Sequence, residues 1–365
     1  MKRREFARNL LSLPLLAAMP SVLEHNAEAQ PVDDMHIPMP PGGCITDVPG
    51  LTAGHYTLTE RPTGCTVVLC EKGAVAGVDV RGSAPGTRET DLLNPINAVQ
   101  TVNAILLSGG SAYGLDAASG VMKYLEEHNA GVKVGGGVVP IVPAAILMDL
   151  GFGGFKPRPD ADAGYKACLA ASSSPLAEGN IGAGAGATIG KMFGPKYRMK
   201  GGFGTSSVKI GDTGIVVAAM VAVNAVGDVV DPHTGKVIAG ARSEDGKGYR
   251  DAMSQIMNGY RVVQSTGANT TIGLVATNAP FTKTQMSKIA QMSHDGYARA
   301  INPVHTMSDG DTIFAMSTGL ANVKADVTAI GAIAATVMAR AIVRAVMNAQ
   351  SILDTPACRD YPAKA

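Results

Sequence analysis

Short apolar runs are the most regular pattern along this chain. Residues 64–69, 74–80 and 104–107 are apolar and rich in β-branched side chains, which predicts strands. Residues 215–223 and 271–276 are nearly continuous apolar runs, so we expect strands that are buried on both faces. These runs predict a chain whose core is built largely from β-strands.

Three longer segments, residues 112–128, 282–301 and 327–347, predict helices. In the first of them the apolar positions follow helical spacing, at Leu115, Ala118, Val121, Met122 and Leu125. No linker rich in Pro or Ser divides the chain, and no internal repeat is present. We therefore expect one compact α/β domain in which helices cover the sheets.

The amino terminus has a different pattern from the rest. It is basic, with paired Arg3-Arg4, and it continues into an apolar run at residues 10–18 and an A-x-A sequence at residues 27–29. This pattern is typical of a twin-arginine export signal, so we expect residues 1–29 to be removed and the protein to be periplasmic. The alternative is a cytosolic chain with a frayed basic terminus.

The composition limits the partners. The 365 residues are 46% hydrophobic and 17% charged, which is typical of a globular protein, and the net charge is +1. A nearly neutral chain has no broad attraction for nucleic acid or for an acidic membrane surface. Outside the amino terminus we identified no run of about 18 apolar residues, the length that a spanning helix needs. We expect neither a nucleic-acid nor a membrane partner.

The five cysteines are scattered and show no C-x-x-C spacing, so they do not predict a zinc or redox motif. An exported protein can form a disulfide, and Cys65 with Cys70 or Cys44 are the possible pairs. We favour buried free thiols instead.

A Gly-rich segment at residues 182–191 resembles a phosphate-binding loop only loosely. Such a loop needs Gly at position 185 and Ser or Thr at position 192, where this chain has Ala185 and Met192. The seven His residues are dispersed, and we interpret each, including His294 and His305, as exposed or structural. With no G-x-S-x-G motif and no His-rich metal motif, we expect no cofactor and no metal.

An Asn-Thr pair, Asn269-Thr270, stands at the head of the last predicted strand. This junction resembles the self-cleavage site of the DmpA-type aminopeptidases, which include L-aminopeptidase/D-esterases, β-peptidyl aminopeptidases and the nylon-oligomer endohydrolase. The resemblance extends over nearly the whole mature chain. It includes residues 81–91, 106–115, 182–191, 200–207, 223–227 and 309–311.

Thr270 is the nucleophile that this resemblance implies. A threonine hydroxyl is a poor nucleophile without a neighbouring base. Cleavage before Thr270 frees an α-amine with a pKa near ~7.7–8.0, which is partly neutral at pH 7 and can act as that base. The resemblance further implies that Lys191 is a cation that keeps the amine neutral and that Asn224 is an oxyanion-hole donor.

Asp309 and Asp311 match the acidic or hydroxyl pair that orients the nucleophile in relatives. The alternative interpretation of Asp-Gly-Asp is an ordinary turn. One departure from the family concerns residues 144–149, where some relatives have a catalytic Tyr and this chain has Met148. On its chemistry, Tyr113 is a candidate replacement.

The resemblance implies an αββα-like sandwich similar to the N-terminal-nucleophile hydrolases, with different strand connectivity. It also implies self-cleavage into a large chain, residues 30–269, and a small chain, residues 270–365, assembled as an oligomer of heterodimers. We expect an aminopeptidase that acts on peptides, amides or esters. The alternatives are an endo-acting hydrolase of oligoamides and an exported binding protein that keeps the fold without cleaving.

Overall fold

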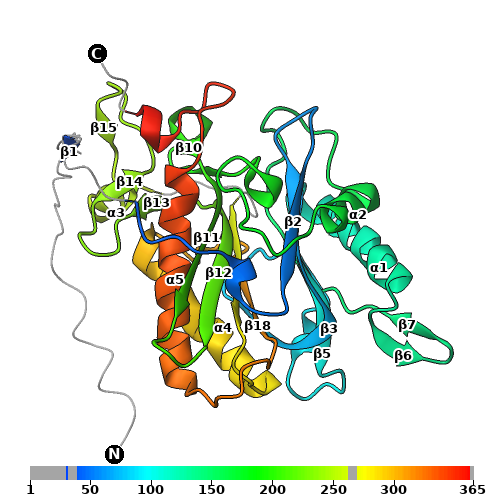
Figure 1. The fold of residues 1–365 in the computed structure, drawn as a ribbon. Helices are drawn as coiled ribbons and strands as arrows, with labels where there is room; N and C mark the ends of the chain where they lie inside the picture. The colour runs from blue at the N-terminus through cyan, green and yellow to red at the C-terminus, as the bar shows by residue number, and fades with distance from the viewer. Residues whose placement is uncertain (1–29, 32–38, 262–268, 362–365) are drawn as a thin grey trace, which may run out of the picture.

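The structure, a computed structural model, describes residues 30–31, 39–261 and 269–361. Within these residues the chain forms four layers, with two helices outside each of two β layers (Figure 1). The predicted export signal lies outside the described residues. The expected αββα-like α/β class is confirmed by the three apolar interfaces that separate the layers.

The first β layer contains the strands that carry the end of the predicted site. Its order is β11-β12-β16-β18, and only β16 and β18 run parallel. The bounds are β11 Gly202–Lys209, β12 Val216–Asn224, β16 Thr270–Thr277 and β18 Thr312–Ser317. The strands predicted at residues 215–223 and 271–276 are therefore confirmed.

The second β layer is joined to the first by one long strand, β3. Its members are β2 Thr52–Thr57, β3 Gly64–Val80, β4 Thr87–Arg88, β5 Thr101–Ser108 and β8 Ala144–Ile146. The first half of β3 pairs with β2 and β5, and its second half pairs with β18. The sequence predicted two separate strands here, which was wrong. The interruption is only a register shift between Leu69 and Ala74, where Gly73 takes a positive φ of 85° while the chain stays extended.

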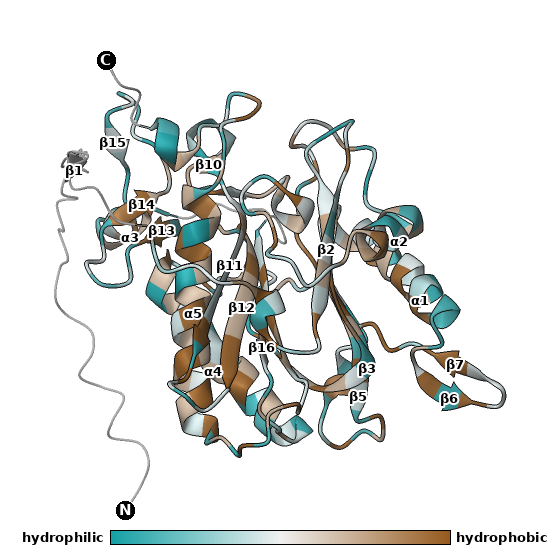
Figure 2. Ribbon diagram, viewed as in Figure 1, coloured by the Kyte–Doolittle hydropathy of each residue, from teal (hydrophilic) through white to brown (hydrophobic). Residues whose placement is uncertain are grey.

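Alternation along the strands divides the core into three interfaces. In β12, Val217, Ala219, Val221 and Val223 face the helices α4 and α5, whereas Val216, Ala218, Met220 and Ala222 face the other β layer. Side chains of successive strand residues point to opposite faces, so a strand covered on both sides is apolar throughout. Figure 2 shows this continuous hydrophobic colour along β12.

The helices differ from the predictions mainly at one end. Helices α4 Lys283–Ala300 and α5 Val327–Met347 match the predicted segments and pack on the first β layer. Helices α1 Ala117–Glu127 and α2 Ala161–Leu169 cover the second layer. The predicted helix at residues 112–128 begins later, because a 3-10 helix, η3 Ser111–Asp116, follows the left-handed Gly110.

Helix α5 is the one described helix that is long and apolar enough to cross a membrane by length and composition. In this structure 67% of its apolar window is buried inside the protein. Its apolar length is therefore explained by packing between α4 and strands β11 and β12.

Shorter elements fill the loops. The remaining strands are β1 Gln30–Pro31, β6 Val132–Val134, β7 Gly137–Val139, β9 Thr188–Ile189, β10 Met199–Lys200, β13 Asp228–Val230, β14 Val237–Ala239, β15 Gly248–Tyr249 and β17 Ile301–Asn302. The remaining helices are α3 Ala252–Met257 and the 3-10 helices η1 Ile45–Asp47, η2 Asp91–Leu93, η4 Gly182–Gly184, η5 Pro195–Tyr197 and η6 Cys358–Asp360. All five cysteines are free thiols, and all except Cys358 are buried.

Candidate active site

The predicted site residues come together at one end of the first β layer. Thr270 is the first residue of β16, and its antiparallel register partner is Asn224, the last residue of β12. On the other side of β16, the Asp309–Asp311 loop leads directly into β18. Lys191 reaches Asn224 from the loop after β9. Residues far apart in the sequence therefore meet because three neighbouring strands begin or end at one edge.

The carbonyl group of Asn269, in the peptide bond that precedes Thr270, is held by hydrogen bonds from two sides. The Thr270 hydroxyl donates a hydrogen bond to the carbonyl oxygen of Asn269. The backbone N–H of Gly310 donates to the same oxygen at 3.0 Å. The Asn269 N–H in turn donates to the carbonyl oxygen of Ser308 at 3.3 Å. Two donors therefore converge on the carbonyl group next to the predicted nucleophile, Thr270.

Position 310 requires glycine because the chain segments lie too close for a side chain. A Cβ atom there would lie 2.6 Å from the carbonyl oxygen of Ala84 and 2.9 Å from Oγ1 of Thr270.

Residues 81–84 hold the Asp309–Asp311 loop through backbone hydrogen bonds. The N–H groups of Arg81 and Gly82 donate to the Asp311 carbonyl at 3.0 and 3.1 Å, and that of Ala84 donates to the Asp309 carbonyl at 2.9 Å.

The two carboxylates of the loop are buried and have different partners. Oδ2 of Asp309 accepts hydrogen bonds from the N–H of Thr306 at 3.0 Å and from its hydroxyl at 2.5 Å. Oδ1 of Asp311 accepts from the N–H of Thr271 at 2.7 Å, directly beside Thr270. Burial, and then the nearby charge of Asp311, raise the pKa of Asp309 to about 6. The loop therefore makes hydrogen bonds to the backbone on both sides of Thr270.

Lys191 and Asn224 form a second polar pair, and Asn224 is the register partner of Thr270. Nζ of Lys191 donates to both the backbone oxygen and Oδ1 of Asn224, each at 2.9 Å. Two further hydrogen bonds orient the Asn224 amide. Its Oδ1 accepts from the N–H of Thr188 at 3.0 Å, and its Nδ2 donates to the Met148 carbonyl at 2.9 Å. Burial lowers the pKa of Lys191 to about 7, and the charge of Asp309 opposes that shift.

Two buried cations support the loops around this pair, and sequence reasoning missed both roles. Nζ of Lys200 donates to the backbone oxygens of Gly184, Ala187 and Gly201 at 2.7–3.0 Å. The guanidinium of Arg61 pairs with Asp149 at 2.5 Å, and both side chains are fully buried. A single basic residue in the sequence gave no sign that its side chain would be enclosed by polar groups of other segments.

At the position where some relatives have a catalytic Tyr, this chain has Met148, and the structure shows where both Met148 and the candidate replacement Tyr113 lie. The segment that carries Met148 does reach the site, but through its backbone carbonyl. The Tyr113 ring is 55% exposed and lies beneath the Arg158 guanidinium at 3.8 Å. Its hydroxyl makes no hydrogen bond within the described part of the chain. The proposed replacement by Tyr113 therefore stays a prediction without support from its contacts.

His305 is the site neighbour that the sequence interpretation did not connect to the nucleophile. Its Nδ1 lies 2.8 Å from Oδ2 of Asp311. The available signal was its position six residues before Asp311 in one loop, counted as 311 minus 305. Across residues 30–31, 39–261 and 269–361, no group of three or more His, Cys, Asp or Glu side chains is arranged to hold a metal ion.

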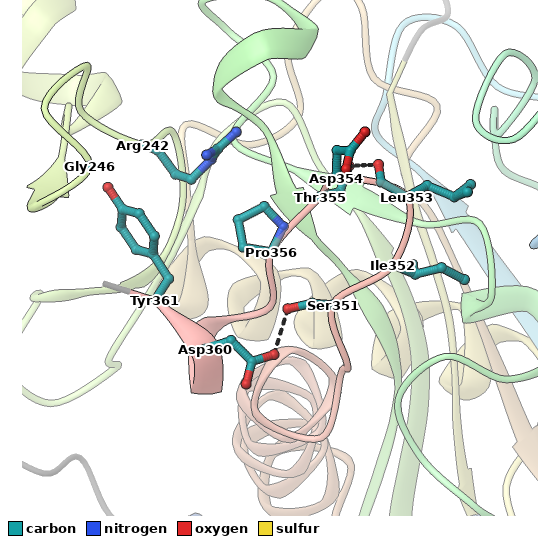
Figure 3. A pocket seen from close by; sticks show the side chains of 10 residues that line it. All are labelled: Arg242, Gly246, Ser351, Ile352, Leu353, Asp354, Thr355, Pro356, Asp360 and Tyr361. Atoms are coloured by element: carbon teal, nitrogen blue, oxygen red, sulfur yellow. Dashed lines mark hydrogen bonds between the residues drawn. The ribbon is translucent and has the colours of Figure 1, made fainter. Parts of the chain in front are cut away.

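Two cavities lie on either side of Ile352 and Leu353, which line both of them. One, of about 560 Å³, is lined by residues 351–356 together with Arg242, Gly246, Asp360 and Tyr361 (Figure 3). The other, of about 320 Å³, is lined by residues 57–62 and shares Ile352 and Leu353 with the first. None of the predicted catalytic side chains lines either cavity.

Comparison with known proteins gives one family. The model of peptidase family S58 matches residues 43–356. An uncharacterized aminopeptidase of Mycobacterium tuberculosis is 44% identical over 342 residues, which cover 87% of this chain and 97% of the relative. A 6-aminohexanoate-oligomer endohydrolase of Paenarthrobacter ureafaciens is 31% identical over 318 residues, covering 82% and 84%.

Solved structures give the same fold. A β-aminopeptidase of a Burkholderia species superposes with a TM-score of 0.63 at 23% identity, covering 87% of this chain and 90% of that one. An L-aminopeptidase D-Ala-esterase/amidase of Ochrobactrum anthropi, described as a new variant among the Ntn hydrolase fold, gives 0.62 at 20% identity, covering 88% and 90%. The expected likeness to N-terminal-nucleophile hydrolases is therefore confirmed at the level of fold.

Proposed function

This chain belongs to peptidase family S58 and is a hydrolase, and from that premise we propose that it cleaves itself before Thr270 and then uses Thr270 as its nucleophile. The observation that carries the proposal is the convergence on one carbonyl group. The Thr270 hydroxyl and the Gly310 N–H both bind the oxygen of Asn269, in the bond that would break.

The cleavage step can be written with its atoms balanced. Oγ1 of Thr270 attacks the Asn269 carbonyl carbon, and the Gly310 N–H stabilises the negative charge that develops on the oxygen. Collapse of the tetrahedral intermediate breaks the C–N bond, and the hydroxyl proton is transferred to the departing nitrogen. Water then hydrolyses the resulting ester, which leaves an Asn269 carboxylate, a free Thr270 amine and a restored hydroxyl.

The freed amine then serves as the general base of turnover. An α-amine has a pKa near ~7.7–8.0, so part of it is neutral at pH 7 and can accept the proton of its own hydroxyl. Lys191 in its cationic form would favour the neutral amine by charge repulsion. The Asn224 Nδ2 donates one hydrogen to Met148, which leaves its second hydrogen for a substrate oxyanion.

Asp309 and Asp311 are proposed to orient the nucleophile. The Asp311 carboxylate fixes the peptide group that follows Thr270, through its bond to the N–H of Thr271. Asp309 lies in the same buried loop and has one carboxylate oxygen engaged by Thr306. A carboxylate near the new amine would favour its correct placement, because the two groups attract when the amine is protonated.

The two fragments are expected to remain together after cleavage. The small chain, residues 270–365, would supply β16, β18, α4 and α5. In the described structure β16 pairs with β12 along its full length, and β18 pairs with β3. Both partner strands belong to the large chain, residues 30–269. Separation would therefore expose the core on both faces of the first β layer.

The substrate class follows from the relatives. Aminopeptidase action on small peptides, amides or esters is the proposal, because the relatives that are 43–44% identical are named aminopeptidases. Endo-cleavage of oligoamides is the second candidate, favoured by the 31% identity to the 6-aminohexanoate-oligomer endohydrolase. A binding protein that never cleaves is the third and is disfavoured by membership of a peptidase family.

Intact-mass analysis of purified protein tests the proposal. We expect two fragments, with the smaller beginning Thr270-Thr-Ile-Gly, whereas full activity from an uncut chain would exclude the mechanism. Substrate profiling with oligomers that have free or blocked amino ends separates the first two candidates. If only oligomers with a free amino end are cleaved and single end residues are released, the protein is an aminopeptidase. If oligomers with a blocked amino end are cleaved at the same rate as free ones, it is an endohydrolase.

Two further properties complete the proposal. We propose export to the periplasm from Arg3-Arg4 and the residues that follow, and assembly as a homo-oligomer of heterodimers. Cell fractionation checks the first, since replacing both arginines by lysine should trap the precursor in the cytosol. Size-exclusion chromatography with light scattering checks the second, since the particle mass should be a multiple of the summed fragment masses.

A further inference from the structure

An imidazole lies directly behind the proposed acidic pair, and the roles described above do not use it. Nδ1 of His305 lies 2.8 Å from Oδ2 of Asp311, and the backbone N–H of His305 donates to the same oxygen at 3.0 Å. The other oxygen of this carboxylate, Oδ1, accepts the N–H of Thr271 at 2.7 Å. Asp311 therefore bridges His305 and the peptide group next to Thr270.

The contact fixes which ring nitrogen carries hydrogen. An ionised carboxylate oxygen only accepts hydrogen bonds, so Nδ1 of His305 must be the donor. Nε2 is buried and has no hydrogen-bond partner among the described residues. Among the described residues, the ring therefore makes one polar contact, from Nδ1 to Asp311.

The ring is held in place from the other side by helix α4. It packs against His294 with ring centroids 4.8 Å apart and against Tyr297 at 6.0 Å. The His305 backbone has φ of +56°, in the left-handed region that non-glycine residues rarely adopt. Such backbone strain persists where the surroundings determine the conformation, and it is concentrated at functional sites.

The charged and titratable groups that face this ring are few. Asp311 contacts it directly, and His294 and Tyr297 cover it. Behind His294 lie Asp79, whose carbonyl accepts from His294 Nε2 at 3.1 Å, and Arg81, which pairs with Asp79. Burial lowers the pKa of His294 to about 3 and raises that of Tyr297, so both are neutral near pH 7.

We infer that His305 is a positioning residue for Thr270 that acts through Asp311. Its Nδ1–H holds the carboxylate so that Oδ1 keeps the N–H of Thr271, and this fixes the peptide group on which the Thr270 hydroxyl and future amine are mounted. The Nδ1–H also offsets part of the negative charge of Asp309 and Asp311, which have only Gly310 between them in the sequence. This inference rests on the proposed function and adds a residue outside its catalytic set.

Two polar, non-titrating substitutions test the inference. Asn places its amide near the Nδ1 position and tolerates a positive φ, so His305→Asn keeps the donor to Asp311. His305→Gln places its amide near the Nε2 position and loses that donor. The readouts are the rate of precursor cleavage, and kcat and KM per mole of free N-terminal Thr270, measured across pH.

We expect His305→Gln to lower the cleavage rate and kcat by roughly 10- to 100-fold with KM within about threefold, the size expected when a buried acceptor loses its donor. His305→Asn should restore both rates to within about threefold of wild type. His128→Asn, at an exposed helix end, is the matched control and should leave both unchanged.

The outcomes separate this inference from the proposed function. Equal rates for His305→Asn and His305→Gln, whether both high or both low, would overturn the role of the Nδ1 donor. If Thr270→Ala still yields fragments and turnover, the proposed function itself fails. If Thr270→Ala is an inert single chain while His305→Gln matches wild type, only the His305 inference fails.

Discussion

The N–H of Gly310 and the hydroxyl of Thr270 meet on the carbonyl oxygen of Asn269, although 40 residues, counted as 310 minus 270, separate the two donors in the sequence. The parallel pairing of β16 with β18 produces this contact, because it places the loop before β18 beside the first residue of β16. The hydroxyl proposed to attack and the N–H proposed to stabilise the oxyanion are therefore both in place at the same peptide bond.

Replacement of Thr270 separates the role of its hydroxyl from the role of its methyl group. Thr270→Ala should leave a single inactive chain, because no oxygen remains to attack Asn269. Thr270→Ser keeps the hydroxyl and should still yield two fragments. Electrophoresis and intact mass over a time course measure both. Fragments from the Ala variant with the same new terminus would show that another group cuts the chain.

Replacement of Gly310 by Ala should slow self-cleavage. The added Cβ would lie 2.6 Å from the Ala84 carbonyl oxygen and 2.9 Å from Oγ1 of Thr270, so the loop or the hydroxyl must move. Overpacking of this kind costs ~1–3 kcal/mol in stability. Gly137→Ala is the control, since its Cβ would meet nothing within 4 Å. Precursor half-life reports cleavage and urea unfolding reports stability, and equal half-lives for the two variants would contradict a close fit at Gly310.

Loss of the Asn224 amide should reduce turnover more than it reduces folding. Asn224→Ala removes the proposed oxyanion donor, and such losses cost ~10²–10³ in kcat. Because the same amide also binds Lys191, Thr188 and Met148, the melting temperature should fall as well. Steady-state kinetics on matured protein gives the first effect and calorimetry the second. Near wild-type kcat would make Asn224 a structural residue only.

The charge on Lys191 should set one limb of the pH profile. Its pKa is lowered to about 7, so the cation is present below that pH and is lost as pH rises through it. If the cation assists turnover, kcat should fall through this range, and Lys191→Arg, which stays charged, should lack that fall. Lys191→Ala should lose most turnover at every pH. A wild-type kcat that rises through pH 7, with no such rise in the Arg variant, would instead make neutral Lys191 a base.

Buried thiols should destabilise the protein above pH 9. Burial raises the pKa of Cys168 from 9.0 to about 12, so the unfolded chain loses this proton before the folded chain does. Stability is then lost as pH rises above 9, by roughly 1.4 kcal/mol per pH unit for one such thiol.

The measurement for this effect is the difference between wild type and Cys168→Ala in urea unfolding at several pH values. The difference is needed because buried Lys200 acts with the opposite sign. Its pKa is lowered to about 7, so the unfolded chain holds the extra proton and stability rises between pH 7 and 10.5. A wild-type curve parallel to that of Cys168→Ala above pH 9 would contradict the thiol assignment.

The sequence predicted the parts of the site that lie in local motifs. Asn269-Thr270, Lys191 and the Asp309–Asp311 turn each have a recognisable neighbourhood, and the structure brings them together at one sheet edge. The sequence did not connect His305 to the site, because its position there depends on a left-handed backbone and on packing against α4, which local sequence does not reveal. Lys200 and Arg61 were missed for a similar reason, since most of their partners, such as the Gly184 and Ala187 oxygens and the Asp149 carboxylate, come from other segments of the chain.

For the fold as well, elements that depend on local sequence were predicted and elements that depend on distant contacts were not. Helices α4 and α5 and strands β12 and β16 were predicted closely, because each is a long or continuous apolar segment. The single strand β3 was predicted as two, since apolar periodicity cannot reveal that Gly73 continues an extended chain. The late start of α1 was missed because the left-handed Gly110 and the 3-10 turn after it depend on contacts with the second β layer.

The central place of β16 has a consequence for refolding. This strand lies between β12 and β18, and every β12–β16 pair would join the two proposed fragments. A precursor can form those pairs within one chain, at a rate independent of protein concentration. A denatured mature protein would have to form them by collision of two chains, against the entropy of association. Maturation would thereby make folding a one-time event, after which recovery from unfolding slows as the protein is diluted.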